Sequence, residues 1–188
     1  MINFEGMKAE ENKTKFDPLP AGPYIGTIKD ARVDGKAPDQ SLILRLDVTD
    51  GDYAAYFTLR YRHDKDNEGS YPAKYKGDFR LRIPNRDNPN SKYPESDKRR
   101  FNDALYRIEQ SNPGYHWDGD ETKLKGKEVG FSMQDDEYNG NPFTRIARLE
   151  IVGDIQKGLV KVMPPRKRRE PEVPQGFTQV EDDSEIPF

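Results

Sequence analysis

The last seven residues of the chain combine acidic side chains with an apolar end, a pattern that suits a docking peptide. They read Asp182-Asp183-Ser184-Glu185-Ile186-Pro187-Phe188. Acidic residues steer a peptide toward a basic surface, while Phe188 can enter a pocket and its α-carboxylate can accept hydrogen bonds from Lys or Arg. Burial of one Phe contributes about 1.5–3 kcal/mol, so after ordering costs we expect an affinity on the order of micromolar. The expected partner-binding residues are Asp182, Asp183, Glu185, Ile186, Pro187 and Phe188.

Basic side chains are concentrated in one part of the chain, where aromatic residues lie among them. The whole chain has a net charge of -3, but residues 60–107 hold 13 Lys or Arg against 8 Asp or Glu. Sequence-tolerant binding of single-stranded DNA needs this combination, because cations follow the phosphates and aromatic faces stack on the bases. The expected DNA contacts are Arg45, Tyr56, Arg60, Arg62, Tyr71, Lys74, Tyr75, Lys76, Arg80 and Arg82.

Several side chains also have a simpler interpretation. Tyr71 and Tyr75 can anchor their loop while the neighbouring charges only solvate it. Trp117, next to His116, can stack on a base or cover the end of the hydrophobic core. The basic run Arg166-Lys167-Arg168-Arg169 can bind phosphate, fold back on the acidic tip or keep the linker soluble. The sequence leaves these alternatives open.

The elements that must position these residues begin with two strands. Over residues 22–33 the apolar positions change parity near Gly26, as in a bulged and strongly curved strand. Residues 42–48 alternate cleanly between apolar and other side chains, and Asp50-Gly51 then supplies the positive φ of a hairpin turn. Curvature of this kind suits a small barrel.

We expect a third strand over residues 53–62, because its odd positions suit a core. Its even positions place Tyr56, Arg60 and Arg62 on the opposite face, which is cationic and aromatic. Arg45 on the preceding strand is expected beside them. This shared strand face is the centre of the predicted DNA surface.

A long excursion and a helix follow. Residues 63–94 are rich in Gly, Pro, Asn and charge, and a short alternating run over 79–83 predicts an added strand. Apolar residues from Phe101 to Ile108 recur at helical spacing. Ser96 is the expected cap of this helix, and Asn112-Pro113-Gly114 is expected to end it.

Residues 129–133 and 147–151 alternate as two final strands, with a hairpin signal at Asn139-Gly140. The order is three strands, one helix and two strands. This order predicts a mainly β protein, a five-stranded Greek-key barrel of the OB-fold type with its helix between strands three and four. An α+β sandwich, with the helix laid on one open sheet, fits the same pattern.

Composition limits the remaining possibilities. Mean hydropathy is -1.06 and the chain has 15 prolines and no cysteine. We expect one domain over 1–163, with an arm over 1–20, and a disordered linker and tip over 164–188. The sequence has no thiolate zinc site, and a calcium-like run from His63 has Tyr75 where the bidentate Glu belongs. We therefore expect no enzyme activity, no cofactor and no metal. Without a long apolar stretch or a secretory signal we expect no membrane partner and a cytoplasmic location.

The tip resembles the acidic end of bacterial and phage single-stranded DNA-binding proteins, in which several Asp precede Ile or Leu, Pro and Phe. Ile186-Pro187-Phe188 matches this pattern, whereas Ser184 and Glu185 replace two Asp. The runs 109–115 and 124–130 also resemble a phage or mobile-element family of such proteins. The resemblance implies an OB-fold that coats single strands, recruits replication or recombination proteins and can form a homo-oligomer. It also implies that the cytoplasmic location is in a bacterial host cell.

Two other hypotheses fit the sequence. The acidic net charge suits an interaction module whose tip occupies host tail-binding pockets as a decoy, without binding DNA. A strand-annealing recombination protein is the third possibility. Binding of an unstructured oligonucleotide separates the first hypothesis from the decoy, and accelerated pairing of complementary strands would indicate annealing.

Overall fold

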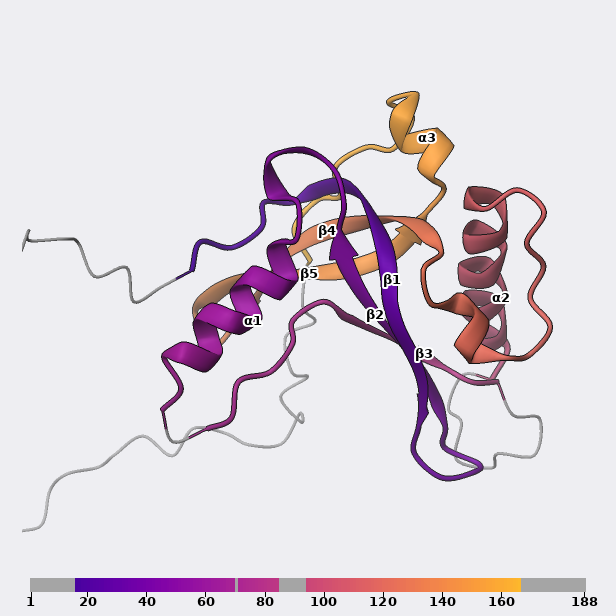
Figure 1. Ribbon diagram of the computed structural model, residues 1–188, viewed down its shortest axis with the longest axis horizontal. Coiled ribbons are helices and arrows are strands. Elements are labelled where there is room, and N and C mark those ends of the chain that lie inside the picture. The colour runs from indigo at the N-terminus through magenta and orange to yellow at the C-terminus, as the bar shows by residue number, and fades with distance from the viewer. Residues whose placement is uncertain (1–15, 70, 85–93, 167–188) are drawn as a thin grey trace, which may run out of the picture.

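The computed structural model describes residues 16–69, 71–84 and 94–166, which form one sheet with flanking helices (Figure 1). The expected docking tip and Lys167-Arg168-Arg169 lie outside these ranges, as do residues 1–15 of the expected arm. The described part of the arm belongs to the folded body, because Leu19 is fully buried.

Five antiparallel strands form one open sheet in the order β3-β2-β1-β4-β5. The strands are β1 (Gly22–Asp34), β2 (Ser41–Val48), β3 (Asp78–Arg82), β4 (Glu128–Tyr138) and β5 (Asn141–Glu150). The prediction of a mainly β protein with five strands is confirmed. Within the described residues no pairing of β3 with β5 closes the sheet.

Strand β1 carries the predicted bulge, slightly later than Gly26. Ile28 pairs with Leu46 and Asp30 pairs with Arg45, so Lys29 is the extra residue. Ile28 is fully buried in the core. Because of the bulge, Asp30 turns to the opposite face together with Arg45. The bulge therefore sets which β1 side chains reach each face of the sheet.

The prediction of a strand over residues 53–62 is wrong. A short 3-10 helix, η1 (Gly51–Tyr53), leads into the helix α1 (Tyr56–Asp66). Gly51 has the expected positive φ, 74°, but it begins η1 instead of a hairpin. The third strand is β3, formed by the short run that the sequence predicted as an added strand.

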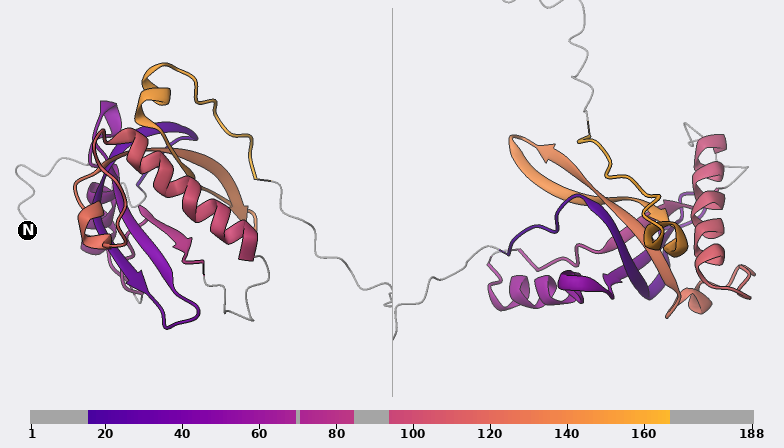
Figure 2. Two further views of the ribbon diagram at one scale, coloured as in Figure 1. Left: turned by 90° about the vertical axis from the view of Figure 1, so that its right-hand side faces the viewer. Right: turned by 90° about the horizontal axis from the view of Figure 1, so that it is seen from above.

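Helix α2 (Pro94–Ser111) lies between β3 and β4, as predicted. It begins at Pro94, so Ser96 lies in its first turn and not at its cap. Past its end, Gly114 has a φ of 82°. Trp117 packs against the core beyond this point. Helices α1 and α2 lie at opposite ends of the sheet (Figures 1 and 2).

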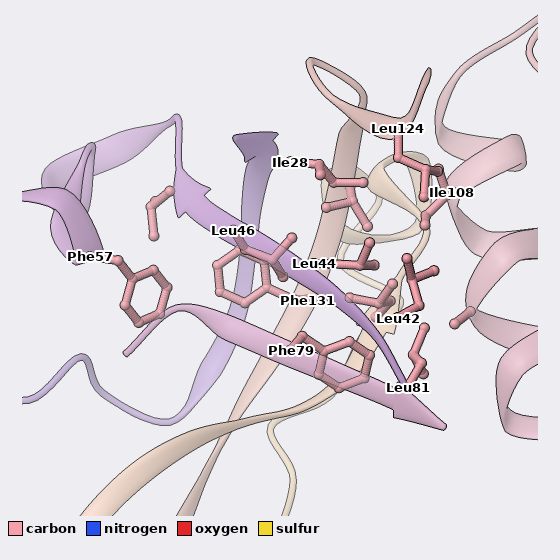
Figure 3. Close-up of a cluster of buried hydrophobic side chains, with 14 of the residues drawn as sticks. Ile28, Leu42, Leu44, Leu46, Phe57, Phe79, Leu81, Ile108, Leu124 and Phe131 are labelled. Carbon is pink, nitrogen blue, oxygen red and sulfur yellow. The ribbon is translucent and has the colours of Figure 1, made fainter. Parts of the chain in front are cut away.

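The hydrophobic core lies between the sheet and its helices. Figure 3 shows Leu42, Leu44 and Leu46 of β2 gathered with Phe79 and Phe131. Helix α2 contributes the buried residues Phe101, Ala104, Leu105 and Ile108. The periodicity that predicted this helix therefore identified its buried face.

Leu19 bridges α1 and β5 where the sheet is open. Its backbone N–H donates to the Tyr56 hydroxyl at 2.8 Å. Its carbonyl oxygen accepts from the Thr144 hydroxyl at 2.7 Å. The Tyr56 hydroxyl in turn donates to the Asp17 carbonyl at 2.8 Å. One extended segment thus seals the core between the two elements.

The remaining elements are short. Asn139 and Gly140 have φ values of 51° and 75°, which confirms the predicted hairpin between β4 and β5. The 3-10 helix η2 (Glu121–Leu124) precedes β4, and the helix α3 (Val152–Gln156) follows β5. In the described part of the chain, no helix is long and apolar enough to span a bilayer.

Candidate nucleic-acid interface

Three rows of residues cross β1, β2 and β3 on the side of the sheet opposite the core, which we call the outer face. The first row holds Asp30, Arg45 and Asp78, the second Arg32, Ile43 and Arg80, and the third Asp34, Ser41 and Arg82. Three of the expected DNA contacts, Arg45, Arg80 and Arg82, thus share one face. Arg32 joins them, although the sequence analysis missed it. The sequence held one indication of this position: the apolar residues of this strand change parity, as they do when a bulge turns the following side chains to the other face.

Asp78 joins two arginines at the centre of the outer face. Arg45 donates to both of its carboxylate oxygens, with Nε–Oδ1 at 2.9 Å and Nη2–Oδ2 at 3.2 Å. Arg32 donates from Nη2 to Oδ2 at 3.1 Å. The hydrogen bonds to Asp78 raise the pKa of the Arg45 guanidinium. Asp30 lies 4.0 Å from Arg32, so two arginines face two carboxylates and the charges balance at this point.

Arg80 and Arg82 continue the basic surface along β3. Arg80 donates to Asp34 at 2.8 Å, and this hydrogen bond lowers the pKa of the Asp34 carboxyl. Arg82 lies 3.9 Å from Asp97 of α2. A hollow of about 400 Å³ opens beside them, lined by Asp39, Ser41, Arg80, Leu81, Arg82, Asp97, Arg100 and Phe101. Arg100 is a further cation at this site that the sequence analysis did not select.

Tyr75 lies at the other end of the outer face, beside Arg45. The Arg45 guanidinium carbon is 4.7 Å from the centre of the Tyr75 ring. The Tyr61 ring centre lies 5.9 Å from that of Tyr75. Burial raises the pKa of the Tyr75 hydroxyl to about 12. A hollow of about 390 Å³ is lined by Arg45, Tyr61, Ala73, Lys74, Tyr75 and Asp78.

The backbone before β3 holds Tyr75 in this position. The Tyr75 hydroxyl donates to the Leu46 carbonyl at 2.9 Å, and the Leu46 N–H donates to the Gly77 carbonyl at 2.9 Å. A Cβ atom on Gly77 would lie 2.5 Å from the Leu46 carbonyl oxygen. The close approach of this segment to β2 therefore requires glycine at position 77.

A third hollow continues the path away from the sheet. It measures about 510 Å³ and is lined by His63, Asp64, Asn67, Glu68, Gly69, Tyr71, Pro72, Ala73, Lys74 and Lys76. Lys74 lines both this hollow and the one beside Tyr75. The Tyr71 side chain is 86% exposed. The expected residues Tyr71, Lys74, Tyr75 and Lys76 therefore lie together at the end of the outer face.

The three remaining expected contacts lie on α1 and do not share a strand face. Tyr56 is only 5% exposed and holds Leu19, so it belongs to the core. Arg60 donates to the Tyr56 hydroxyl at 3.2 Å and lies 3.8 Å from Asp64. Arg62 is exposed, and helical geometry turns it away from Arg60. The prediction that these residues share a face was wrong, because it assumed a strand where the chain forms the helix α1.

Two further features lie on the β4–β5 hairpin. Tyr138 and Phe143 are exposed aromatic residues near its tip. The start of the expected linker runs along β4, where the Arg166 N–H donates to the Asp135 carbonyl at 2.9 Å. The Arg166 guanidinium lies 3.3 Å from the buried carboxylate of Asp136. Arg166 thus has a structural partner that none of the sequence alternatives included.

Comparison with known proteins gives no family: no protein-family model matches the chain, and no curated protein sequence matches it. Within residues 16–69, 71–84 and 94–166, no cluster of three or more His, Asp or Glu is placed to hold a metal ion. The outer face is therefore the feature of the described residues from which a function can be inferred.

Proposed function

We propose that the protein binds single-stranded DNA without sequence preference along the outer face of β1, β2 and β3. The observation that carries the proposal is the continuity of this surface. Guanidinium groups run from Arg82 to Arg45, and the aromatic and basic hollow around Tyr75 and Lys74 continues from there. Such a surface offers cations to successive phosphates and ring faces to bases.

The topology is compatible with the same proposal. The strands of the open sheet lie in the order β3-β2-β1-β4-β5, with α2 between β3 and β4, and an OB-type barrel opened between β3 and β5 would have this order. OB-folds bind single strands on the face of strands two and three and with the loop between strands four and five. Here that loop is the β4–β5 hairpin with Tyr138 and Phe143.

The ion pairs on the outer face are compatible with phosphate binding. Arg80 and Asp34 are both more than half exposed. Exposed pairs of this kind contribute about 0.2–1 kcal/mol each. A DNA phosphate can replace a carboxylate as the acceptor of a guanidinium at little cost, and it brings the entropy of released counterions. The arginines are thus held in place until DNA binds.

We propose further that the C-terminal tip recruits replication or recombination proteins to the coated strand. The proposal rests on the sequence pattern of Ile186, Pro187 and Phe188 and on the acids that precede them. Arg166, the last described residue before the tip, is held on β4.

Fluorescence anisotropy with a labelled unstructured oligonucleotide tests DNA binding. We expect tight binding to the single strand, little binding to duplex, and a slope of log affinity against log salt of about -0.7 per phosphate contact. Arg45→Gln should weaken binding and make that slope shallower by about one contact. Arg99→Gln, an exposed cation on α2, is the matched control and should change neither quantity. Equal affinity for duplex, or no binding of either DNA, would reject the proposal, and the second result favours the decoy hypothesis.

A further inference from the structure

A separate hollow on α1 has a chemistry opposite to that of the outer face. It measures about 360 Å³, and we call it the α1 pocket. Its lining residues are Phe16, Asp17, Asp52, Tyr53, Ala54, Tyr56, Leu59 and His63. The Phe16 ring lies 5.3 Å from the Tyr56 ring and 5.5 Å from the His63 ring, centre to centre. Half of the residues that line this pocket are aromatic.

The α1 pocket presents apolar surface at its mouth. The Tyr53 side chain is 40% exposed and Leu59 is 47% exposed. Asp17 and Asp52 line the pocket and are exposed, whereas no Lys or Arg lines it. Two carboxylates without a lysine or arginine repel phosphate, and they also repel an acidic peptide such as residues 182–188. The pocket suits an apolar group that has a cation beside it.

We propose that the α1 pocket binds the proline-rich basic segment of the same chain, residues 167–174. This segment reads Lys167-Arg168-Arg169-Glu170-Pro171-Glu172-Val173-Pro174. Proline-rich peptides dock in aromatic-lined grooves, because their extended conformation is already formed and costs little entropy. Pro171, Val173 or Pro174 would lie against the rings, and the preceding cations would lie near Asp17 and Asp52. The inference does not depend on DNA binding.

The end of the described chain lies within reach of the α1 pocket. The Arg166 N–H contacts Asp135, which pairs with Thr144 across the β4–β5 ladder. The Thr144 hydroxyl contacts Leu19, and Leu19 contacts Tyr56 in the pocket wall. Neighbouring strands lie about 5 Å apart, so this path spans roughly 20 Å. Eight residues in polyproline II conformation span about 25 Å, which is enough.

The absence of cysteine from the sequence gives a direct test in the full chain. A nitroxide on Gln175→Cys would be the only spin label, immediately after the segment. We expect the amide NMR signals of residues 52–63 to lose at least half of their intensity, while those of residues 102–106 on α2 keep theirs. Leu59→Lys should abolish the loss, because it adds a cation at the mouth of the pocket. Tyr106→Lys is the matched control, since Tyr106 is 54% exposed on α2, and it should leave the loss unchanged.

Three outcomes would overturn the proposal. The first is equal broadening on α1 and α2, or none on either. The second is broadening on α1 that persists in Leu59→Lys. The third comes from mixing isotope-labelled chain that lacks the nitroxide with unlabelled chain that carries it. Loss of the α1 signals in that mixture as well would identify a second copy as the source of the segment.

Discussion

The side chain of Asp47 on β2 accepts the backbone N–H of Phe57 on α1 at 3.0 Å. It also accepts the Thr58 hydroxyl and the N–H of its own neighbour Val48. Ala55, at the N-terminal boundary of α1, provides no side-chain cap. A buried carboxylate from the preceding strand therefore caps this helix, and it ties α1 to the sheet.

We expect Asp47→Ala to lower the free energy of unfolding by about 2–4 kcal/mol, because it removes hydrogen bonds to a buried charge and leaves the N–H of Phe57 without an acceptor. Urea denaturation followed by circular dichroism measures this. Asp50→Ala is the control, because Asp50 is exposed and caps only η1 through Gly51. We expect it to cost less than about 1 kcal/mol. Similar losses for the two variants would contradict the role given to Asp47.

Arg45 and Arg32 both donate to Asp78 on the outer face, so under the proposed function Asp78 would compete with phosphate for them. Asp78→Asn should therefore increase affinity for a single-stranded oligonucleotide, by up to about fivefold, the equivalent of one partly exposed ion pair. Anisotropy titration at low salt measures this. Asp103→Asn, which removes an equivalent partner of Arg107 on α2, should leave affinity unchanged. Weaker binding by Asp78→Asn would show that Asp78 mainly positions the arginines.

Tyr71 has the most exposed ring in the candidate interface. We expect Tyr71→Ala to weaken oligonucleotide binding by about 1–3 kcal/mol, the range for one base stacked on an aromatic side chain. The melting temperature should not change, because the ring buries little surface. Tyr106→Ala removes a comparably exposed ring from α2 and should bind like the original protein. If Tyr71→Ala bound the oligonucleotide with full affinity, base stacking on Tyr71 would be excluded and only the rings around Tyr75 would remain as candidates.

Burial raises the pKa values of Tyr24 and Tyr75 to about 12, from the ordinary value of 10.0. The folded protein thus favours the neutral phenols, whereas the unfolded chain loses these protons near pH 10. The stability from these phenols is fully present below pH 10 and is lost as pH rises through 12. Denaturation at pH 9, 10 and 11 should show this decline. In Tyr75→Phe the decline should be shallower, and an unchanged slope would contradict the shift at Tyr75.

Deletion of Phe188 should abolish capture of partner proteins, because it removes the apolar anchor and moves the terminal carboxylate. DNA affinity should stay equal or rise, since the remaining acidic peptide can only compete with phosphate. Pull-down from a bacterial lysate and anisotropy titration measure the two properties on the same protein. Deleting Ser184 instead provides a control of equal length. Unchanged capture after loss of Phe188 would reject the docking role of the tip.

The sequence predicted those elements whose evidence is local. The apolar face of α2 predicted this helix, and the turn residues Asn139-Gly140 predicted the last hairpin. Helix α1 could not be predicted in this way, because it buries only Tyr56 and Phe57 and its cap comes from β2. The alternation of aromatic residues along this segment is the pattern of a strand, and it led to the wrong prediction. The hydrogen bond that caps α1, from the Phe57 N–H to Asp47, joins residues that only the fold brings together.

The same distinction holds for the candidate interface. Arg80 and Arg82 alternate with apolar residues on β3, so their shared face was visible in the sequence. Arg32 was hidden, since its direction depends on a bulge whose position only the strand pairing fixes. Tyr56 was assigned to the DNA surface because the wrong element was assumed, and its hydroxyl in fact holds Leu19.

The link through Leu19 between α1 and β5 affects how easily the edges of the sheet can move apart. In a closed barrel, the strand number and stagger fix the circumference. Here, among the described residues, no ladder of backbone hydrogen bonds joins β3 to β5. Two hydrogen bonds through Leu19 join α1 to β5 in its place. We therefore expect β3, which carries Arg80 and Arg82, to move more easily relative to the β4–β5 hairpin than it would in a closed barrel. Under the proposed function, this freedom would let the outer face fit single strands of different bulk and curvature while the sheet stays intact.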